Sequence, residues 1–416
     1  MHWRSCGVNL FLRVFLPFVA GFYVSYAFRS VNALLGPQIA VEFGLSAAKL
    51  GLLTSVYFLA FALFQIPAGI LLDRHGPRRI NAALLLVAAA GAVVFAAAPS
   101  YPFLILGRAL IGLGVCVCLM ASFQAFALWY PTERLATMNS RAFAVGVLGA
   151  MTATVPLELA LRVAGWRSIM FACAVAPVAV AVSLFFVVPE REQRPARDSR
   201  LAAFAGVRHL VADPVFRGIT AVVSTSQCAS VSLITLWIAT WLRDVAGYDP
   251  EAVGRGLFVV SVAMIAGYLF FGRLADLRAR RGAPTVTVVA GAVTVAVGCL
   301  ALLGLGVKTW PLALWSGFIF FSSAPTVLYS TLLRRFPKEM AGRVGTTVNT
   351  FTFGVMFLGQ WGVGLVLSLW PQTSLGYAPG AYSWGLGMLA ALQFAGLAWL
   401  WLGRKLYCST STATGN

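Results

Sequence analysis

The sequence predicts an all-α membrane protein with twelve transmembrane helices in two pseudo-symmetric six-helix bundles. Two observations predict this fold: a series of long apolar segments, and a short loop motif that occurs twice, about half a chain apart. Of the 416 residues, 60% are hydrophobic and 11% are charged. A soluble protein of this length could not bury so much apolar surface, so the chain belongs in a bilayer.

Twelve apolar segments are long enough to span the membrane, since a helix needs ~20 residues to cross the hydrocarbon core. Backbone polar groups in lipid must be satisfied within the segment, which predicts helices, and the segments are too long and continuous for barrel strands. The segments are 11–35, 48–72, 80–99, 102–129, 142–162, 168–188, 218–242, 255–275, 283–306, 310–333, 344–369 and 382–403.

The longest internal polar stretch divides these segments into six and six. We therefore expect an N-terminal bundle at 1–188, a cytoplasmic linker at 189–217, and a C-terminal bundle at 218–416 that ends in a short cytoplasmic tail.

The repeated motif lies at the end of a long apolar run in each half. It reads Gly69-Ile-Leu-Leu-Asp73-Arg74-His75-Gly76-Pro77-Arg78-Arg79 in the first copy and Gly272-Arg-Leu-Ala-Asp276-Leu-Arg-Ala-Arg280-Arg281 in the second, with the two Asp residues 203 positions apart. A second pair, Pro131-Thr-Glu133 and Pro337-Lys-Glu339, repeats at an offset of 206. Two similar halves in a polytopic membrane protein are typical of secondary transporters.

The net charge of +18 is distributed as a membrane topology requires. With a cytoplasmic N-terminus, 23 of the 31 Lys and Arg residues fall in cytoplasmic loops and ends, and only six fall on the other side. This positive-inside bias predicts a multi-pass protein of a bacterial-type plasma (inner) membrane with both termini cytoplasmic. It also argues against nucleic acid as a partner, so the lipid bilayer and a small solute are the expected partners of a functional monomer.

The loop from Gly69 to Arg79 resembles the signature between the second and third helices of the major facilitator superfamily, and the resemblance covers all twelve spans. In that family the loop stabilises the outward-facing state. The resemblance implies a conformational latch, and a basic loop that only sets topology is the alternative. The latch residues would be Gly69, Asp73, Arg74, Gly76, Arg78, Arg79 and Asp276. The first copy departs from the family at Pro77, where an Arg is common.

The stretch Leu106-Gly107-Arg108 to Gly114 resembles the fourth-helix motif of the same family, with an Arg inside the span. In proton-coupled members this Arg often pairs with an acid on the first helix. Here the first span has no Asp or Glu and carries Arg29 instead. Intramembrane cations are costly and are functional candidates by default, although Arg29 could also extend to the interface.

Polar side chains share helical faces in several spans, and such faces converge at the midplane of these folds, where substrate binds. The alternative for each residue is a tie between helices or plain packing. The predicted substrate-binding residues are Arg29, Asn32, Tyr57, Gln65, Arg108, Gln124, Gln227, Tyr329 and Gln360.

Glu158 is the one acid well inside a span. It is predicted either to carry the coupling proton or to pair with Arg162 four residues later.

The sequence predicts no enzyme, no cofactor and no metal centre. It has no phosphate-binding Gly-x-x-x-x-Gly-Lys-Ser/Thr loop, so a gradient must supply the energy. Cys116 and Cys118 point in different directions on a helix, which leaves a soft-metal importer thinly supported. We expect transport by alternating access, as proton-coupled uptake of a small organic anion, because the cations lack buried acids. The alternatives are an exporter of an amphipathic drug-like compound or siderophore, and a transporter-like sensor.

Overall fold

The computed structural model describes residues 10–190, 207–281, 285–336, 340–373 and 376–402. In this part of the chain, eleven helices are long and apolar enough to cross a membrane, and a twelfth apolar segment, Pro311–Val327, is shorter. The prediction of an all-helical membrane protein is confirmed. The shorter segment is the predicted tenth span, which breaks into three pieces.

The chain forms two compact units, one from residues 1–44 and 56–197 and the other from 45–55 and 198–416. The predicted linker, 189–217, includes residues 191–206 outside the described ranges, so its role as the boundary stays a prediction. The predicted division gave the whole second span to the first bundle. In the structure, residues 45–55, which include the first eight residues of that predicted span, pack with the second unit.

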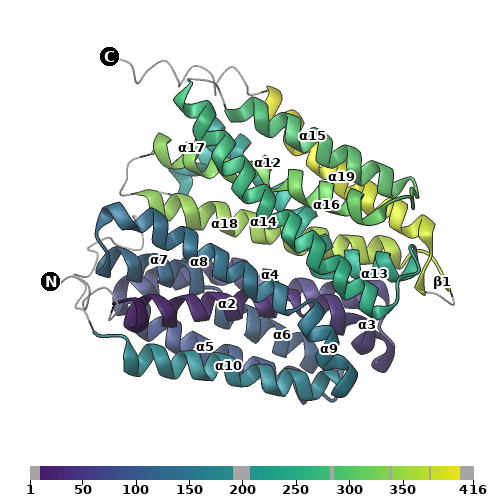
Figure 1. Cartoon of the computed structure of the whole chain (residues 1–416), viewed down its shortest axis with the longest axis horizontal. Helices are drawn as coiled ribbons and strands as arrows, with labels where there is room; N and C mark the ends of the chain where they lie inside the picture. Colours follow the sequence, from purple (N-terminus) through teal and green to yellow (C-terminus); the bar gives the residue numbers. More distant parts are fainter. Residues whose placement is uncertain (1–9, 191–206, 282–284, 337–339, 374–375, 403–416) are drawn as a thin grey trace. The chain divides into compact units, whose positions relative to one another are not determined.

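The first unit consists of helices (Figure 1): η1 (Phe11–Phe15), α2 (Leu16–Ser30), α3 (Asn32–Glu42), α4 (Ala47–His75, from residue 56), α5 (Pro77–Ala96), α6 (Tyr101–Val115), α7 (Cys118–Trp129), α8 (Thr132–Thr152), α9 (Val155–Val163) and α10 (Trp166–Val187). Helix α5 packs along α6 and α10, and α2 packs along α8. A Cβ on Gly107 of α6 would lie 2.6 Å from the Phe95 nitrogen of α5, so these two backbones are in direct contact. Small residues permit this approach between membrane helices.

The second unit contains α12 (Pro214–Ser232), η2 (Leu233–Trp237), α13 (Ile238–Asp244), α14 (Pro250–Arg280), α15 (Thr285–Gly304), α16 (Pro311–Ser322), η3 (Ala324–Val327), α17 (Leu328–Arg335), α18 (Ala341–Leu367), β1 (Gln372–Thr373), β2 (Gly376–Tyr377) and α19 (Pro379–Leu402). Helix α12 packs on α18 and α19, and α15 packs on α16 and α19. The Asp213 carboxylate caps α12 by accepting from the Phe216 N–H at 2.8 Å. The short strands pair antiparallel, Gln372 opposite Tyr377, and the Asp244 carboxylate holds the hairpin through the Tyr377 N–H at 3.1 Å.

Interruptions in the spans repeat between the halves. The first span breaks at Val31, between α2 and α3, and Ile234, 203 residues later, lies in the π-helical turn η2 of the seventh span. The fourth span breaks at Cys116–Val117, and Ser323, 206 residues after Val117, separates α16 from η3. These offsets equal those of the two sequence motifs, so the breaks belong to the duplicated architecture. Interrupted helices at matched positions mark the binding region in transporters built from repeats.

Candidate functional site

Arg108 lies at the break in the first span. The residue is 1% exposed, and its guanidinium donates to the backbone carbonyls of Phe28, at 2.7 Å, and Arg29, at 3.4 Å. These carbonyls belong to the last turn of α2, where helix carbonyls lack partners and the dipole is negative. The guanidinium carbon also lies 4.9 Å from the centre of the Tyr57 ring. Arg108 therefore stabilises the interrupted backbone.

Arg29 is partly exposed and lies in the last turn of α2 beside two aromatic rings. Its guanidinium carbon is 4.7 Å from the ring centre of Tyr26 and 5.7 Å from that of Phe61 on α4. The Tyr57 hydroxyl donates to the Ser25 carbonyl at 3.3 Å, which fixes this ring one turn from Arg29. Three spans therefore bring two cations and an aromatic surface together. Arg29, Arg108 and Tyr57 were predicted from the sequence as binding residues, whereas Tyr26 and Phe61 were not included among them.

Two more predicted residues lie at breaks in this unit. Asn32 is fully buried and begins α3 directly after Val31. Gln65 is also buried, and its Nε2 donates to the Cys116 carbonyl at 3.4 Å, at the break of the fourth span. Both predicted side chains therefore lie beside irregular backbone, where polar groups need partners.

The structure places Gln124 apart from the two cations. Its Nε2 donates to the Asp73 carboxylate at 3.0 Å, at the end of α4. Sixteen residues of the same span separate it from Arg108, or ~24 Å of helix. Gln124 thus joins the predicted latch residues.

The three predicted residues of the second unit lie on α12, α17 and α18. The Tyr329 hydroxyl on α17 donates to Asn349 Oδ1 on α18 at 3.1 Å. A second hydrogen bond of 2.9 Å joins the hydroxyls of Ser224 on α12, the helix that carries Gln227, and Thr352 on α18. Gln360 is fully buried, and neither its amide nitrogen nor its amide oxygen has a hydrogen-bond partner among the described residues.

Glu158 is buried in the first turn of α9, and its Oε1 accepts from the Arg162 Nε at 2.8 Å. This is the pair that the spacing predicted as one of two alternatives. Its role in proton coupling stays a prediction.

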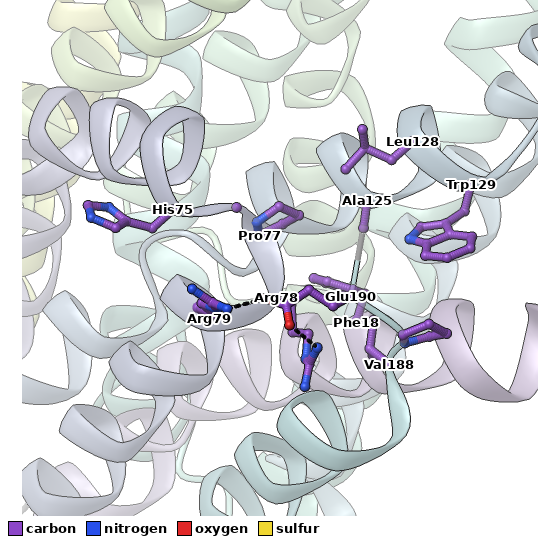
Figure 2. A pocket seen from close by; sticks show the side chains of 12 residues that line it. Phe18, His75, Pro77, Arg78, Arg79, Ala125, Leu128, Trp129, Val188 and Glu190 are labelled. Carbon is purple, nitrogen blue, oxygen red and sulfur yellow. Dashed lines mark hydrogen bonds and ion pairs between the residues drawn. The ribbon is translucent and has the colours of Figure 1, made fainter. Parts of the chain in front are cut away.

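Five predicted latch residues lie at or beside the turn between α4 and α5, namely Asp73, Arg74, Gly76, Arg78 and Arg79, and Figure 2 shows Arg78 and Arg79 there. Asp276 lies on α14 of the second unit. Gly76 adopts φ +81° there, a conformation that favours glycine. Arg78 donates to the Phe185 carbonyl, and both Arg78 and Arg79 form ion pairs with Glu190, which follows α10. Glu190 was not predicted, because an acid 111 residues from Arg79 carries no local signal. A Cβ on Gly69 would lie 3.9 Å from the Met120 methyl carbon, while Arg74 and Asp276 are exposed.

Among the described residues, no group of three or more His, Cys, Asp or Glu side chains is placed to hold a metal ion. What the geometry offers instead is a pair of guanidinium groups, aromatic faces and neutral hydrogen-bonding groups.

The family model of the Major Facilitator Superfamily matches residues 18–360. The chain belongs to the Major Facilitator Superfamily. It is therefore a secondary transporter and not an enzyme. Within the superfamily, the chain is 26% identical over 376 residues to the probable sulfoacetate transporter SauU of Cupriavidus necator, a match that covers 80% of this chain and 82% of that protein. It is 30% identical over 202 residues to the probable nitrate/nitrite antiporter NarK1 of Thermus thermophilus, over 44% of each chain.

The fold itself matches a solved member of the superfamily. The crystal structure of the nucleoside transporter NupG superposes with a TM-score of 0.72 at 14% identity, covering 92% of this chain and 98% of that one. The predicted fold, two bundles of the superfamily type, is confirmed.

Proposed function

We propose that this Major Facilitator Superfamily transporter takes up a small organic anion together with protons, by alternating access. The observation that carries the proposal is the pair of guanidinium groups at the break in the first span. The first, second and fourth predicted spans contain no Asp or Glu, so the charge of this region is positive. A positive, low-dielectric region favours an anion over a cation or a neutral solute.

The two cations have different environments, and we assign them different roles. Arg108 is buried and directs two donors at backbone carbonyls, so it positions the α2 terminus. Arg29 is partly exposed at that terminus, and its planar guanidinium suits bidentate recognition of a carboxylate or sulfonate. The flanking rings of Tyr26 and Phe61 orient it.

The names of two relatives support the same substrate class. SauU is described as a sulfoacetate transporter and NarK1 as a nitrate/nitrite antiporter, and both of these solutes are anions. Because NarK1 matches less than half of this chain, the greater weight rests on the Arg29 environment.

Proton coupling and orientation complete the proposal. Moving one negative charge inward against an inside-negative potential costs ~2.3 kcal/mol per 100 mV, and co-transported protons offset this cost. Glu158 is our candidate for carrying the proton. The Lys and Arg distribution supports cytoplasmic termini in an inner membrane.

Uptake by purified protein in liposomes tests the substrate class. A panel of carboxylates, sulfonates, cations and neutral solutes is offered to the wild type, to Arg29→Gln and to Arg13→Gln. The control removes the same charge from an exposed position on η1. We expect uptake of an anion by the wild type and the control, and its loss in Arg29→Gln. Uptake of cations only, or full anion uptake by Arg29→Gln, would contradict the proposal.

The direction of transport needs a separate measurement. Loading the liposomes with each solute and following its exit under the same gradients distinguishes uptake from the alternative, export of an amphipathic compound.

A further inference from the structure

The N-terminal part of α4 and the C-terminal part of α18 touch through backbone atoms. A Cβ on Gly51 would lie 3.1 Å from the Gln360 carbonyl oxygen and 3.3 Å from the Gly364 Cα. A Cβ on Gly364 would lie 2.5 Å from the Ala47 carbonyl oxygen. We call this meeting of residues 47–51 with 360–364 the glycine contact. All of these residues pack within the second unit.

Trp237 completes the glycine contact. Its indole Nε1 donates to the Gln360 carbonyl at 3.2 Å, and its ring lies 3.3 Å from the position of a Gly51 Cβ. Trp237 is the last residue of the π-helical turn η2 and is fully buried. The interrupted seventh span is therefore joined to the same contact.

The side chain of Gln360 is at odds with this close packing. It is fully buried, yet neither amide atom has a partner among the described residues. Nearly all buried polar groups in proteins are paired, because an unpaired one loses its hydrogen bonds to water without replacement. Gln393 on α19 is equally buried, but its Nε2 donates to the Ser322 hydroxyl at 3.4 Å and only its Oε1 lacks a partner among the described residues. The Gln360 amide therefore lacks a hydrogen bond that the Gln393 amide has.

We propose that Gln360 is a release device for the glycine contact. With the contact closed, the amide is buried and has no hydrogen-bond partner among the described residues, which raises the free energy of the closed arrangement. When residues 47–51 separate from α18, water or another polar group reaches the amide and the penalty disappears. The two glycines permit the close backbone contact, and the unpaired Gln360 amide lowers the free-energy cost of opening it.

Hydrogen–deuterium exchange without substrate tests the device. Gln360→Leu removes the polar group at similar size, so the closed arrangement gains stability. We expect exchange in peptides covering 45–55 and 356–367 to slow by roughly tenfold, the shift that one unpaired buried amide produces. Gly364→Ala drives a methyl group against the Ala47 carbonyl, and exchange in the same peptides should accelerate.

The matched control is Gln393→Leu, the same change at a fully buried amide whose Nε2 has a hydrogen-bond partner and which lies outside the glycine contact. It should leave exchange at 45–55 unchanged. Unchanged or faster exchange in Gln360→Leu would overturn the proposal, as would equal slowing in Gln393→Leu. Gln360→Met, which is unbranched like Gln, serves where Gln360→Leu does not fold.

The inference rests on the proposed alternating-access cycle only for its effect on transport, where Gln360→Leu should lower the maximal rate. The exchange measurement needs no substrate, so it stands if the anion proposal fails. A Gln360 that only binds substrate would change KM while leaving substrate-free exchange as in the wild type, and that result also overturns the proposal.

Discussion

Arg108 acts on the site through Arg29, because its two donated hydrogen bonds hold the carbonyls of Phe28 and Arg29. The planar guanidinium directs two N–H donors at these two carbonyls at once, which the ammonium group of a lysine does not reproduce. The same reasoning separates Arg108 from a plain topological charge, which would sit at the interface rather than at 1% exposure.

Arg108→Lys should therefore keep the charge but lose one of the two carbonyl bonds. We expect a KM increase of about tenfold, the loss of roughly 1.4 kcal/mol from one charge-assisted bond, and a nearly complete loss of uptake in Arg108→Gln. Initial uptake rates across a range of substrate concentrations give KM and the maximal rate. Wild-type KM in both variants would show that Arg108 does not position Arg29.

Glu42 offers a pH-dependent contact at the end of α3. Burial raises the pKa of the Glu42 carboxyl. Hydrogen bonds from Arg167 and Trp166, together with the Arg167 charge, lower the pKa by more than burial raises it, so the net pKa lies below the usual 4.5. A depressed pKa stabilises the folded state above the unfolded pKa, and this contribution is lost as the pH falls through the folded value. As the pH falls below about 4.5, wild-type thermal stability should decrease more steeply than that of Glu42→Gln. Equal slopes in thermal scans of the two proteins would remove this role.

In the first unit, glycine residues permit close packing between helices α5 and α6. Helices α5 and α6 meet at Gly91 and Gly107, where an added Cβ would lie 2.7 Å from the Ile111 nitrogen and 2.6 Å from the Phe95 nitrogen. Backbone atoms cannot rotate away as a flexible side chain can. These helices therefore depend on the absence of two side chains.

Gly107→Ala should destabilise the protein by ~1–3 kcal/mol, the usual cost of overpacking. Gly298→Ala on α15 is the control, because a Cβ there meets no described atom within 4 Å and alanine favours a helix. Thermal melts of both variants in the same detergent provide the comparison. A melting temperature of Gly107→Ala at or above that of the control would show that α5 and α6 can separate without cost.

Across the molecule, the features that were predictable are those encoded locally. The length of each apolar segment predicted the spans. The motif around Asp73 and its second copy around Asp276 indicated the two halves, and each copy can be recognised from its own short stretch of sequence. The position of a residue along the membrane normal was harder to predict than the helical face on which it lies. Gln124 lies seven residues before Pro131, near the end of its span, as Asp73 lies at the end of α4, and the two side chains are hydrogen-bonded. Grouping residues by helical face alone does not use this distance from the end of the span.

Contacts that depend on packing were beyond the sequence. The helix break at Val31 contains no proline, unlike the break at Ser323, which precedes Pro325. It is accompanied by the guanidinium of Arg108, 77 positions later. The orphan amide of Gln360 likewise follows from which helices meet, and a polar face on α18 predicted only that the residue is important.

Energy coupling is a property of the whole transporter and yields the last prediction. If protons accompany the anion, an inside-alkaline gradient of one pH unit should drive accumulation in liposomes by about tenfold for each proton carried, because one unit corresponds to ~1.4 kcal/mol. A protonophore should abolish the accumulation. Glu158→Gln should remove the response to the gradient yet retain exchange of labelled for unlabelled substrate. Arg162→Gln, which breaks the same ion pair but leaves the carboxyl, should retain the response. Accumulation that follows an imposed potential alone, with no effect of the pH gradient, would show that the anion moves without protons.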